Sequence, residues 1–181
     1  MKDEEKTIPS SKNHEGHITV DSELGVGTAF SIYLPASKKH ITTKKDEERL
    51  FVGKGRILVM DEEEVIREAL GAILNYLGYQ VEFTKNGEEA IALYKKNKDS
   101  DQPFDAVILD LTIPGGMGGK ETVKQLIELN PDVKAIVSSG YSTDPVMADY
   151  RNYGFKGVVA KPYDIKELSE TLHEVLIERD E

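Results

Sequence analysis

The sequence predicts an α/β fold in which a doubly wound, five-stranded parallel sheet is covered by helices on both faces. Two observations predict it. Short apolar runs alternate with longer amphipathic stretches, and this order repeats five times between residues 54 and 181. Most of these runs are continuously apolar, which is typical of parallel strands buried on both faces. The crossovers between such strands are expected to be right-handed.

Five segments have the length and composition of buried strands. Each is an apolar or alternating run of four to six residues, too short for a helix and bounded by glycine or polar residues. They lie at residues 56–60, 80–84, 104–109, 133–137 and 157–160.

Five intervening segments carry apolar residues at helical spacing or helix start and stop signals. They lie at residues 63–77, 86–97, 119–129, 144–154 and from 164 onward. Asn86 followed by Glu89, and Asp164 followed by Glu167, are capping boxes that begin helices. A glycine ends the first and the fourth of these helices.

The N-terminal part of the chain differs from the rest. Residues 17–20 and 28–33 alternate between polar and apolar side chains around a glycine-containing turn, which predicts a β-hairpin. A lone hairpin is marginally stable in water, so this one is expected to need a partner surface. The polar, charged stretch that follows is typical of a linker. We therefore predict three parts: a short segment with the hairpin at 1–35, a linker at 36–53 and the α/β domain at 54–181.

Composition excludes several classes of function. The formal net charge is −10, and residues 51–181 hold 24 acidic against 15 basic side chains, so direct binding to nucleic acid is not expected. The chain has no cysteine, so disulfides are excluded and a cytoplasmic location is expected. No apolar run reaches the roughly 20 residues of a membrane-spanning helix. The full-length parent protein is still free to carry a membrane anchor.

Reactive side chains follow four of the predicted strands. Asp61 and Glu62 follow the first strand, Asp110 ends the third, Ser139 follows the fourth and Lys161 follows the fifth. In a doubly wound sheet these four strand ends lie side by side, and active sites lie beyond such ends. The sequence therefore predicts one site that holds three carboxylates, a hydroxyl and an ammonium group.

This set of groups favours phosphoryl transfer. Carboxylates without histidine or cysteine favour Mg²⁺ or Mn²⁺, which neutralises their mutual repulsion. Asp110 is then the nucleophile and forms an aspartyl phosphate without a general base, because a carboxylate is already ionised. The metal ion, Lys161 and the Ser139 hydroxyl are expected to stabilise the charge on the transferred group.

Residues 54–181 resemble the receiver domain of two-component response regulators. Four segments carry the resemblance: VMDE at 59–62, LDLTIPGGMGG at 109–119, SSGYS at 138–142 and AKPY at 160–163. The resemblance implies a flavodoxin-like fold with strand order 2-1-3-4-5 and a cis peptide bond before Pro162. It makes Asp110 the phosphorylation site, with Mg²⁺ held by Asp61, Glu62, Asp110 and the Thr112 backbone carbonyl. It also makes Ser139 the switch hydroxyl and Lys161 the partner of the acceptor.

Two residues depart from the family pattern. Val158 stands where receivers often carry an aromatic ring that turns inward on activation, so the switch is expected to run through Ser139 and the backbone of 140–144. Tyr141 lies two residues after the switch hydroxyl, where a bulky side chain hinders a hydrolytic water. We therefore expect a phosphoryl lifetime longer than minutes.

Residues 13–35 resemble the last strands of the histidine-kinase ATPase domain. The resemblance rests on Asn13-His14, Gly16, the GVGTAF turn at 25–30 and Leu34-Pro35. The asparagine-bearing helix, the adenine contact and the glycine-rich lid of that domain are missing, so autokinase activity is not expected. The simplest interpretation is the C-terminal fragment of a hybrid sensor histidine kinase.

Three functions are compatible with the sequence. The first is a relay receiver that exchanges phosphate with a kinase phosphohistidine domain or a histidine phosphotransfer protein. The second is an aspartyl-phosphate phosphohydrolase, which needs a second aspartate two residues after the nucleophile; here that residue is Thr112. The third is a pseudo-receiver that only binds partners, against which the intact set of Asp110, Ser139 and Lys161 argues. The sequence predicts no oligomeric state.

Overall fold

The computed structural model describes residues 16–36, 50–140 and 144–177, which fall into two units, an N-terminal hairpin and an α/β unit. Each unit is described by itself. Among the described residues, no helix is long and apolar enough to cross a membrane.

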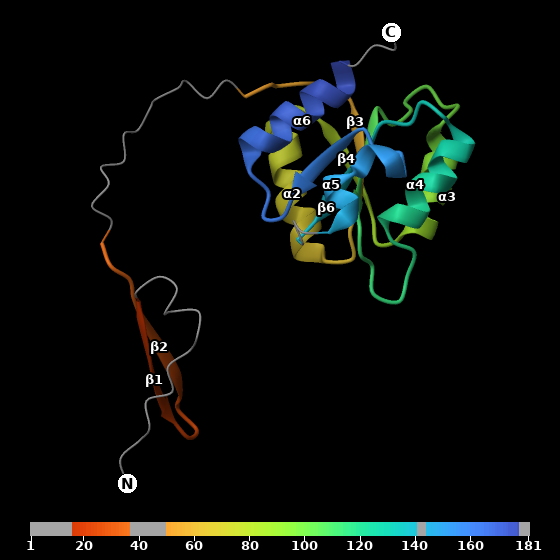
Figure 1. Ribbon diagram of the computed structural model, residues 1–181. Coiled ribbons are helices and arrows are strands. Elements are labelled where there is room, and N and C mark those ends of the chain that lie inside the picture. The colour runs from red at the N-terminus through yellow and green to blue at the C-terminus, as the bar shows by residue number, and fades with distance from the viewer. Residues whose placement is uncertain (1–15, 37–49, 141–143, 178–181) are drawn as a thin grey trace. The chain divides into compact units, whose positions relative to one another are not determined.

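The α/β unit is built on a five-stranded parallel sheet (Figure 1). Its strands are β3 (Arg56–Met60), β4 (Gln80–Thr84), β5 (Ala106–Asp110), β6 (Ala135–Ser139) and β7 (Gly157–Ala160). Their spatial order is β4-β3-β5-β6-β7, and all four neighbouring pairs are parallel. The predicted order 2-1-3-4-5 is confirmed.

Helices cover both faces of this sheet (Figure 1). Helices α2 (Glu64–Tyr76) and α6 (Ile165–Ile177) pack on one face, where their leucines meet Ile57, Val59, Ile108 and Ile136. Helices α3 (Gly87–Asn97), α4 (Gly119–Leu129) and α5 (Pro145–Ala148) pack on the other face. Successive strand residues enter opposite cores, because side chains alternate along a strand. Two buried apolar layers therefore hold the strand ends in fixed positions.

Helix starts follow the predicted capping. The Asn86 side chain accepts a hydrogen bond from the Glu89 N–H at 2.9 Å, and Asp164 accepts from the Lys166 and Glu167 N–H groups at 2.9 Å each. The fourth helix is shorter than predicted. It ends at Ala148, and a 3₁₀ helix, η1 (Tyr150–Tyr153), carries the chain to the left-handed Gly154.

Two strands are displaced towards their C-termini relative to the prediction. Strand β5 begins at Ala106 and includes Asp110, and β6 begins at Ala135 and includes both Ser138 and Ser139. These polar residues pair with the neighbouring strand and so extend the sheet beyond its apolar run; Asp110, for example, is opposite Ser138. The backbones of Asp110, Ser138 and Ser139 are thereby held by the pairing of neighbouring strands.

The N-terminal unit is an antiparallel hairpin of β1 (His17–Glu23) and β2 (Gly27–Tyr33). Val20 pairs with Phe30 and Ile18 with Ile32, which places four apolar side chains on one face of the hairpin. Val20, Phe30 and Ile32 are exposed. Both strands are longer than predicted, because the pairing continues through polar residues up to the turn.

The segment just before β3 packs on the α/β unit. Leu50 contacts the core beneath α2 and α6, Phe51 stacks on His173 with ring centroids 3.8 Å apart, and the Gly53 N–H donates to the Leu77 carbonyl at 2.9 Å. The sequence pattern assigned these residues to the linker. The contacts show that the chain is already held to the α/β unit at Leu50.

Gly118 allows the start of α4 to approach the end of β5. A Cβ atom at Gly118 would overlap the Leu111 carbonyl oxygen, a backbone atom that cannot move aside as a flexible side chain can. We expect Gly118→Ala to lower the free energy of unfolding by about 1–3 kcal/mol through overpacking. Chemical denaturation measures this change. Gly140→Ala is the control, since among the described residues nothing lies within 4 Å of its added Cβ. Equal stability of the two variants would contradict the prediction.

Candidate functional site

Lys161 joins two carboxylates at the C-terminal edge of the sheet. Its Nζ atom lies 2.6 Å from Asp61 Oδ2 and 2.9 Å from Asp110 Oδ2. The side chains of Asp61, Asp110 and Lys161 are 1%, 11% and 12% exposed, so the ion pairs are largely shielded from water. Residues 100 positions apart in the chain thus form one charged cluster.

Hydrogen bonds from neighbouring segments hold Asp61 in place. Its N–H donates to the Thr84 carbonyl at 3.1 Å, and its Oδ1 atom accepts the Glu63 N–H at 3.0 Å. The Arg67 guanidinium donates to the backbone carbonyls of Asp61 and Glu62 at 2.7 and 2.8 Å. Arg67 therefore fixes the acidic turn after β3 from the first turns of α2.

Asp110 is a carboxylate whose surroundings do not fully compensate its charge. Burial raises the pKa of its carboxyl group, and Asp61 adds to that effect by repulsion. Hydrogen bonds from Lys161 and from the Thr112 backbone N–H lower the pKa without cancelling the rise. The cluster holds two carboxylates and one ammonium group, so it lacks one positive charge.

Lys161 is stabilised in its charged form. Burial alone lowers the pKa of a lysine, but the hydrogen bonds to Asp61 and Asp110 outweigh burial and raise the pKa of Lys161. The ammonium group is therefore present across the physiological pH range. Its backbone N–H donates to the Ser139 carbonyl at 2.9 Å, which ties the loop after β7 to β6.

Comparison with known families identifies the family of the domain that carries this site. The model of the response regulator receiver domain matches residues 57–173, which is more than half of the chain. The chain belongs to this family. It is thus a receiver domain of two-component systems, and the resemblance inferred from the sequence is confirmed.

Relatives include both single receivers and sensor kinases. The chain is 31% identical over 122 residues to the chemotaxis protein CheY of Thermotoga maritima, a match that covers 66% of this chain and 96% of CheY. It is 28% identical over 183 residues to the sensor kinase CckA of Brucella abortus. That match covers 93% of this chain, and therefore includes the hairpin, but only 18% of CckA.

Solved receiver structures share the fold. The CheX–CheY–BeF₃–Mg²⁺ complex of Borrelia burgdorferi contains a chain that superposes with a TM-score of 0.62 at 24% sequence identity. The match covers 68% of this chain and 90% of that one. At this level of identity the likeness shows the fold alone.

The structure brings together part of the set predicted from the sequence. Asp61, Asp110 and Lys161 are in contact, and the Lys161–Pro162 peptide bond is cis, as the family resemblance implied. Ser139 is buried at the end of β6, the neighbour of β5. Glu62 is exposed, and the described residues contain no group of three or more acidic or histidine side chains placed to hold a metal ion.

Other predicted features remain predictions. The Thr112 backbone N–H contacts Asp110, whereas the role predicted for its carbonyl oxygen is not tested by this contact. Tyr141, like Asn13 and His14, lies outside the described residues. Val158 is partly buried against the core formed with α3, α4 and α5.

The sequence did not reveal a hydrogen bond beside the cluster. Ser138 Oγ and Tyr163 Oη are 2.8 Å apart, and Ser138 is 1% exposed. Sequence patterns show both residues, but a serine beside a predicted switch serine carries no signal of its own. The Ser138 side chain meets the loop that follows Pro162 only because of the strand register in the sheet.

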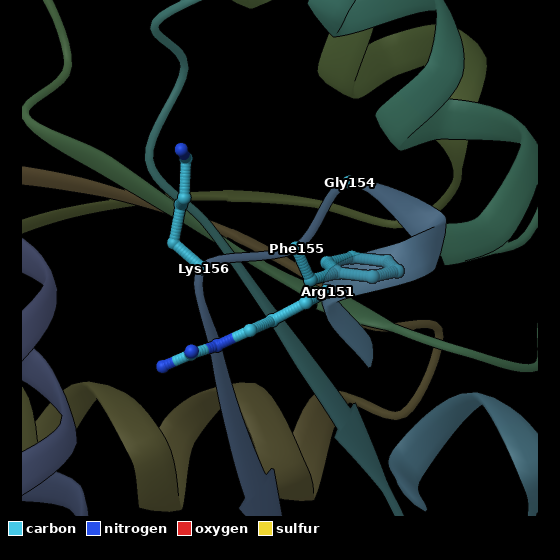
Figure 2. Close-up of a pocket in the computed structure, with 4 residues that line it drawn as sticks. All are labelled: Arg151, Gly154, Phe155 and Lys156. Atoms are coloured by element: carbon cyan, nitrogen blue, oxygen red, sulfur yellow. The ribbon is translucent and has the colours of Figure 1, made fainter. Parts of the chain in front are cut away.

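A separate cavity lies at the other end of β7. Its volume is about 250 Å³, and Figure 2 shows the four residues that line it, Arg151, Gly154, Phe155 and Lys156. Lys156 precedes β7, whereas Lys161 follows it. The cavity therefore takes no part in the acidic cluster.

Proposed function

We propose that Asp110 is the phosphoacceptor of this receiver domain and that it takes its phosphoryl group from a phosphohistidine. One observation carries the proposal: Lys161 holds the buried carboxylate of Asp110 next to that of Asp61. A carboxylate whose pKa is raised by burial while it keeps one oxygen on an ammonium group is a suitable, fixed nucleophile.

The donor set fits Mg²⁺. Asp61 and Asp110 offer hard oxygen ligands, and no nitrogen or sulfur ligand belongs to the cluster. The missing positive charge is a second reason, because a divalent cation compensates two carboxylates that one lysine does not. We propose that Asp61, Glu62, Asp110 and the Thr112 carbonyl would hold the ion; Mn²⁺ is the alternative. When bound, the ion neutralises charge on the phosphoryl oxygens.

The reaction needs few protein groups. An Asp110 carboxylate oxygen attacks phosphorus, the bond between phosphorus and the histidine nitrogen breaks, and its electron pair stays on the imidazole. Lys161 is placed to neutralise the charge of a phosphoryl oxygen once its ammonium group leaves one of its two carboxylate partners. The Ser139 hydroxyl is proposed to donate a hydrogen bond to a second phosphoryl oxygen. Movement of Ser139 and its neighbours is then the proposed switch that changes the surface offered to partners.

The proposed donor is a kinase phosphohistidine domain or a histidine phosphotransfer protein. The CckA match across the hairpin supports an origin in a hybrid sensor kinase, in which residues 1–35 end the ATPase domain and the linker that follows ends before Leu50. We place the domain in the cytoplasm, where ATP-derived phosphohistidine is formed. Turnover as a phosphohydrolase is not proposed, since Thr112 stands where that class needs an aspartate.

Phosphorylation by a small phosphoramidate donor tests the proposal. We expect intact-protein mass spectrometry to show one added phosphoryl group, formed only when Mg²⁺ or Mn²⁺ is present and lost on treatment with hydroxylamine. Chelation with EDTA should abolish the product. Modification that survives hydroxylamine, or that forms equally in EDTA, would contradict the proposal.

A further inference from the structure

The hydrogen bond between Ser138 and Tyr163 lies at the base of the charged cluster. Ser138 is at the end of β6, opposite Asp110 in the sheet register, and its backbone carbonyl accepts the Leu111 N–H at 2.9 Å. The same residue therefore contacts the strand end that presents Asp110 and, through its side chain, the loop that presents Lys161.

Tyr163 holds the loop that presents Lys161 against the core of the domain. It is two residues after Lys161, and its ring packs on the core beneath α2 and α6. The hydrogen bond from the Lys161 N–H to the Ser139 carbonyl also anchors this loop to β6. The phenol oxygen reaches the buried Ser138 hydroxyl, so the loop is attached to β6 at two points on either side of Pro162.

The Tyr163 phenol is also close enough to sense the charges of the cluster. Burial raises the pKa of Tyr163 to about 12, while the Ser138 hydrogen bond and Lys161 oppose the rise and both carboxylates add to it. The phenol is therefore neutral at physiological pH. A neutral hydroxyl pair places no further negative charge beside Asp110.

We infer that Ser138 and Tyr163 are positioning residues for phosphoryl transfer, which act through Lys161 by holding its loop against β6. The inference rests on the function proposed above and goes beyond the groups assigned there. Small displacements of a group that stabilises a transferring phosphoryl reduce the rate strongly. Loss of either hydroxyl should therefore slow phosphorylation while the carboxylates still bind the metal.

The test is a double-mutant cycle with Tyr163→Phe and Ser138→Ala. We expect each variant to lower the maximal phosphorylation rate by about tenfold, and the double variant to lower it no further. The Mg²⁺ concentration at half-maximal rate should change by less than about twofold, because Asp61 and Asp110 are unchanged. A merely structural role would lower stability without this loss of maximal rate.

Tyr94→Phe is the matched control. Tyr94 is also buried, and its phenol accepts a hydrogen bond from the Asn130 side chain at 2.9 Å. Its ring stacks on Phe104, which precedes β5, whereas Asp110 ends β5. Tyr94→Phe should lower the unfolding temperature as Tyr163→Phe does but leave the rate unchanged. Rates are compared at a temperature where every variant is folded.

Three outcomes overturn the inference: a Tyr163→Phe rate within about twofold of wild type, multiplicative losses in the double variant, or an equal loss in Tyr94→Phe. In each of them the wild-type chain still accepts phosphate on Asp110, so the proposed function stands. Failure of the wild-type chain to accept phosphate overturns both.

Discussion

Asp110→Asn is expected to abolish phosphorylation and, in the absence of metal, to make the domain more stable at neutral pH. The amide is no nucleophile towards phosphorus, so no acyl phosphate forms at this position. The stability gain follows from the raised pKa of Asp110, since burial and Asp61 make its ionised form unfavourable in the folded state. Lys161 keeps Asp61 as its partner in the variant.

The pH dependence of this gain has a definite sign. A carboxyl group with a raised folded-state pKa favours folding fully below its unfolded pKa of about 3.9, and this contribution is lost as pH rises through the folded-state pKa. Asparagine does not ionise and keeps the contribution. The difference between variant and wild type should therefore be small near pH 4 and grow towards neutral pH.

Thermal unfolding in EDTA across this pH range measures the effect. Asp132→Asn is the control, because Asp132 is exposed and the change in net charge is the same. A variant that is less stable than wild type at pH 7 would contradict the interpretation that the folded state disfavours ionisation of the Asp110 carboxyl group.

Lys161→Met is expected to produce the largest loss of stability. Removal of the ammonium group leaves Asp61 and Asp110, 1% and 11% exposed, as neighbouring carboxylates without a cation. Removing one partner of a buried charge pair costs about 3–5 kcal/mol. The loss should be smaller at low pH, where the carboxyls are neutral, and smaller when Mg²⁺ is added.

The same variant should lower the phosphorylation rate by about 10²-fold, since one stabilising charge on the transferring group is lost. Denaturant unfolding at two pH values, with and without Mg²⁺, separates the effect on stability from the effect on rate. Lys95→Met is the control, because Lys95 is exposed on α3. If Lys161→Met is as stable as Lys95→Met at pH 7, the salt bridges contribute nothing to the fold.

Local signals were sufficient to predict most of the fold. Apolar runs of strand length and capping residues such as Asn86 and Asp164 act within a few residues, so sequence spacing reveals them. The parallel order follows from general rules for alternating strands and helices. These rules also place Asp61, Asp110 and Lys161 at one edge, because the carboxyl ends of neighbouring parallel strands coincide.

Features that depend on register or side-chain direction were not predicted. The Ser138–Tyr163 hydrogen bond requires the pairing of β5 with β6 and the course of the loop after Pro162, neither of which spacing encodes. The exposure of Glu62 is a similar case. It follows Asp61 directly, so the turn that buries one carboxylate directs the other towards solvent.

The hairpin shows the same division. Alternation in β1 and β2 predicts two strands and one apolar face, and the pairing of Val20 with Phe30 agrees. Sequence alternation does not say which surface covers that face, because alternation within two strands carries no information about residues outside them.

Beryllofluoride binding is the decisive test of the phosphoacceptor site, since this anion mimics a phosphoryl group on a carboxylate held beside a metal ion. We expect saturable binding in NMR titrations, with the largest shifts at Asp61, Asp110, Ser139 and Lys161, and only when Mg²⁺ and beryllofluoride are both present. Asp110→Asn should show no such binding. Equal shifts in Asp110→Asn, or shifts that do not need Mg²⁺, would contradict a phosphoacceptor site built on the carboxylates that Lys161 joins.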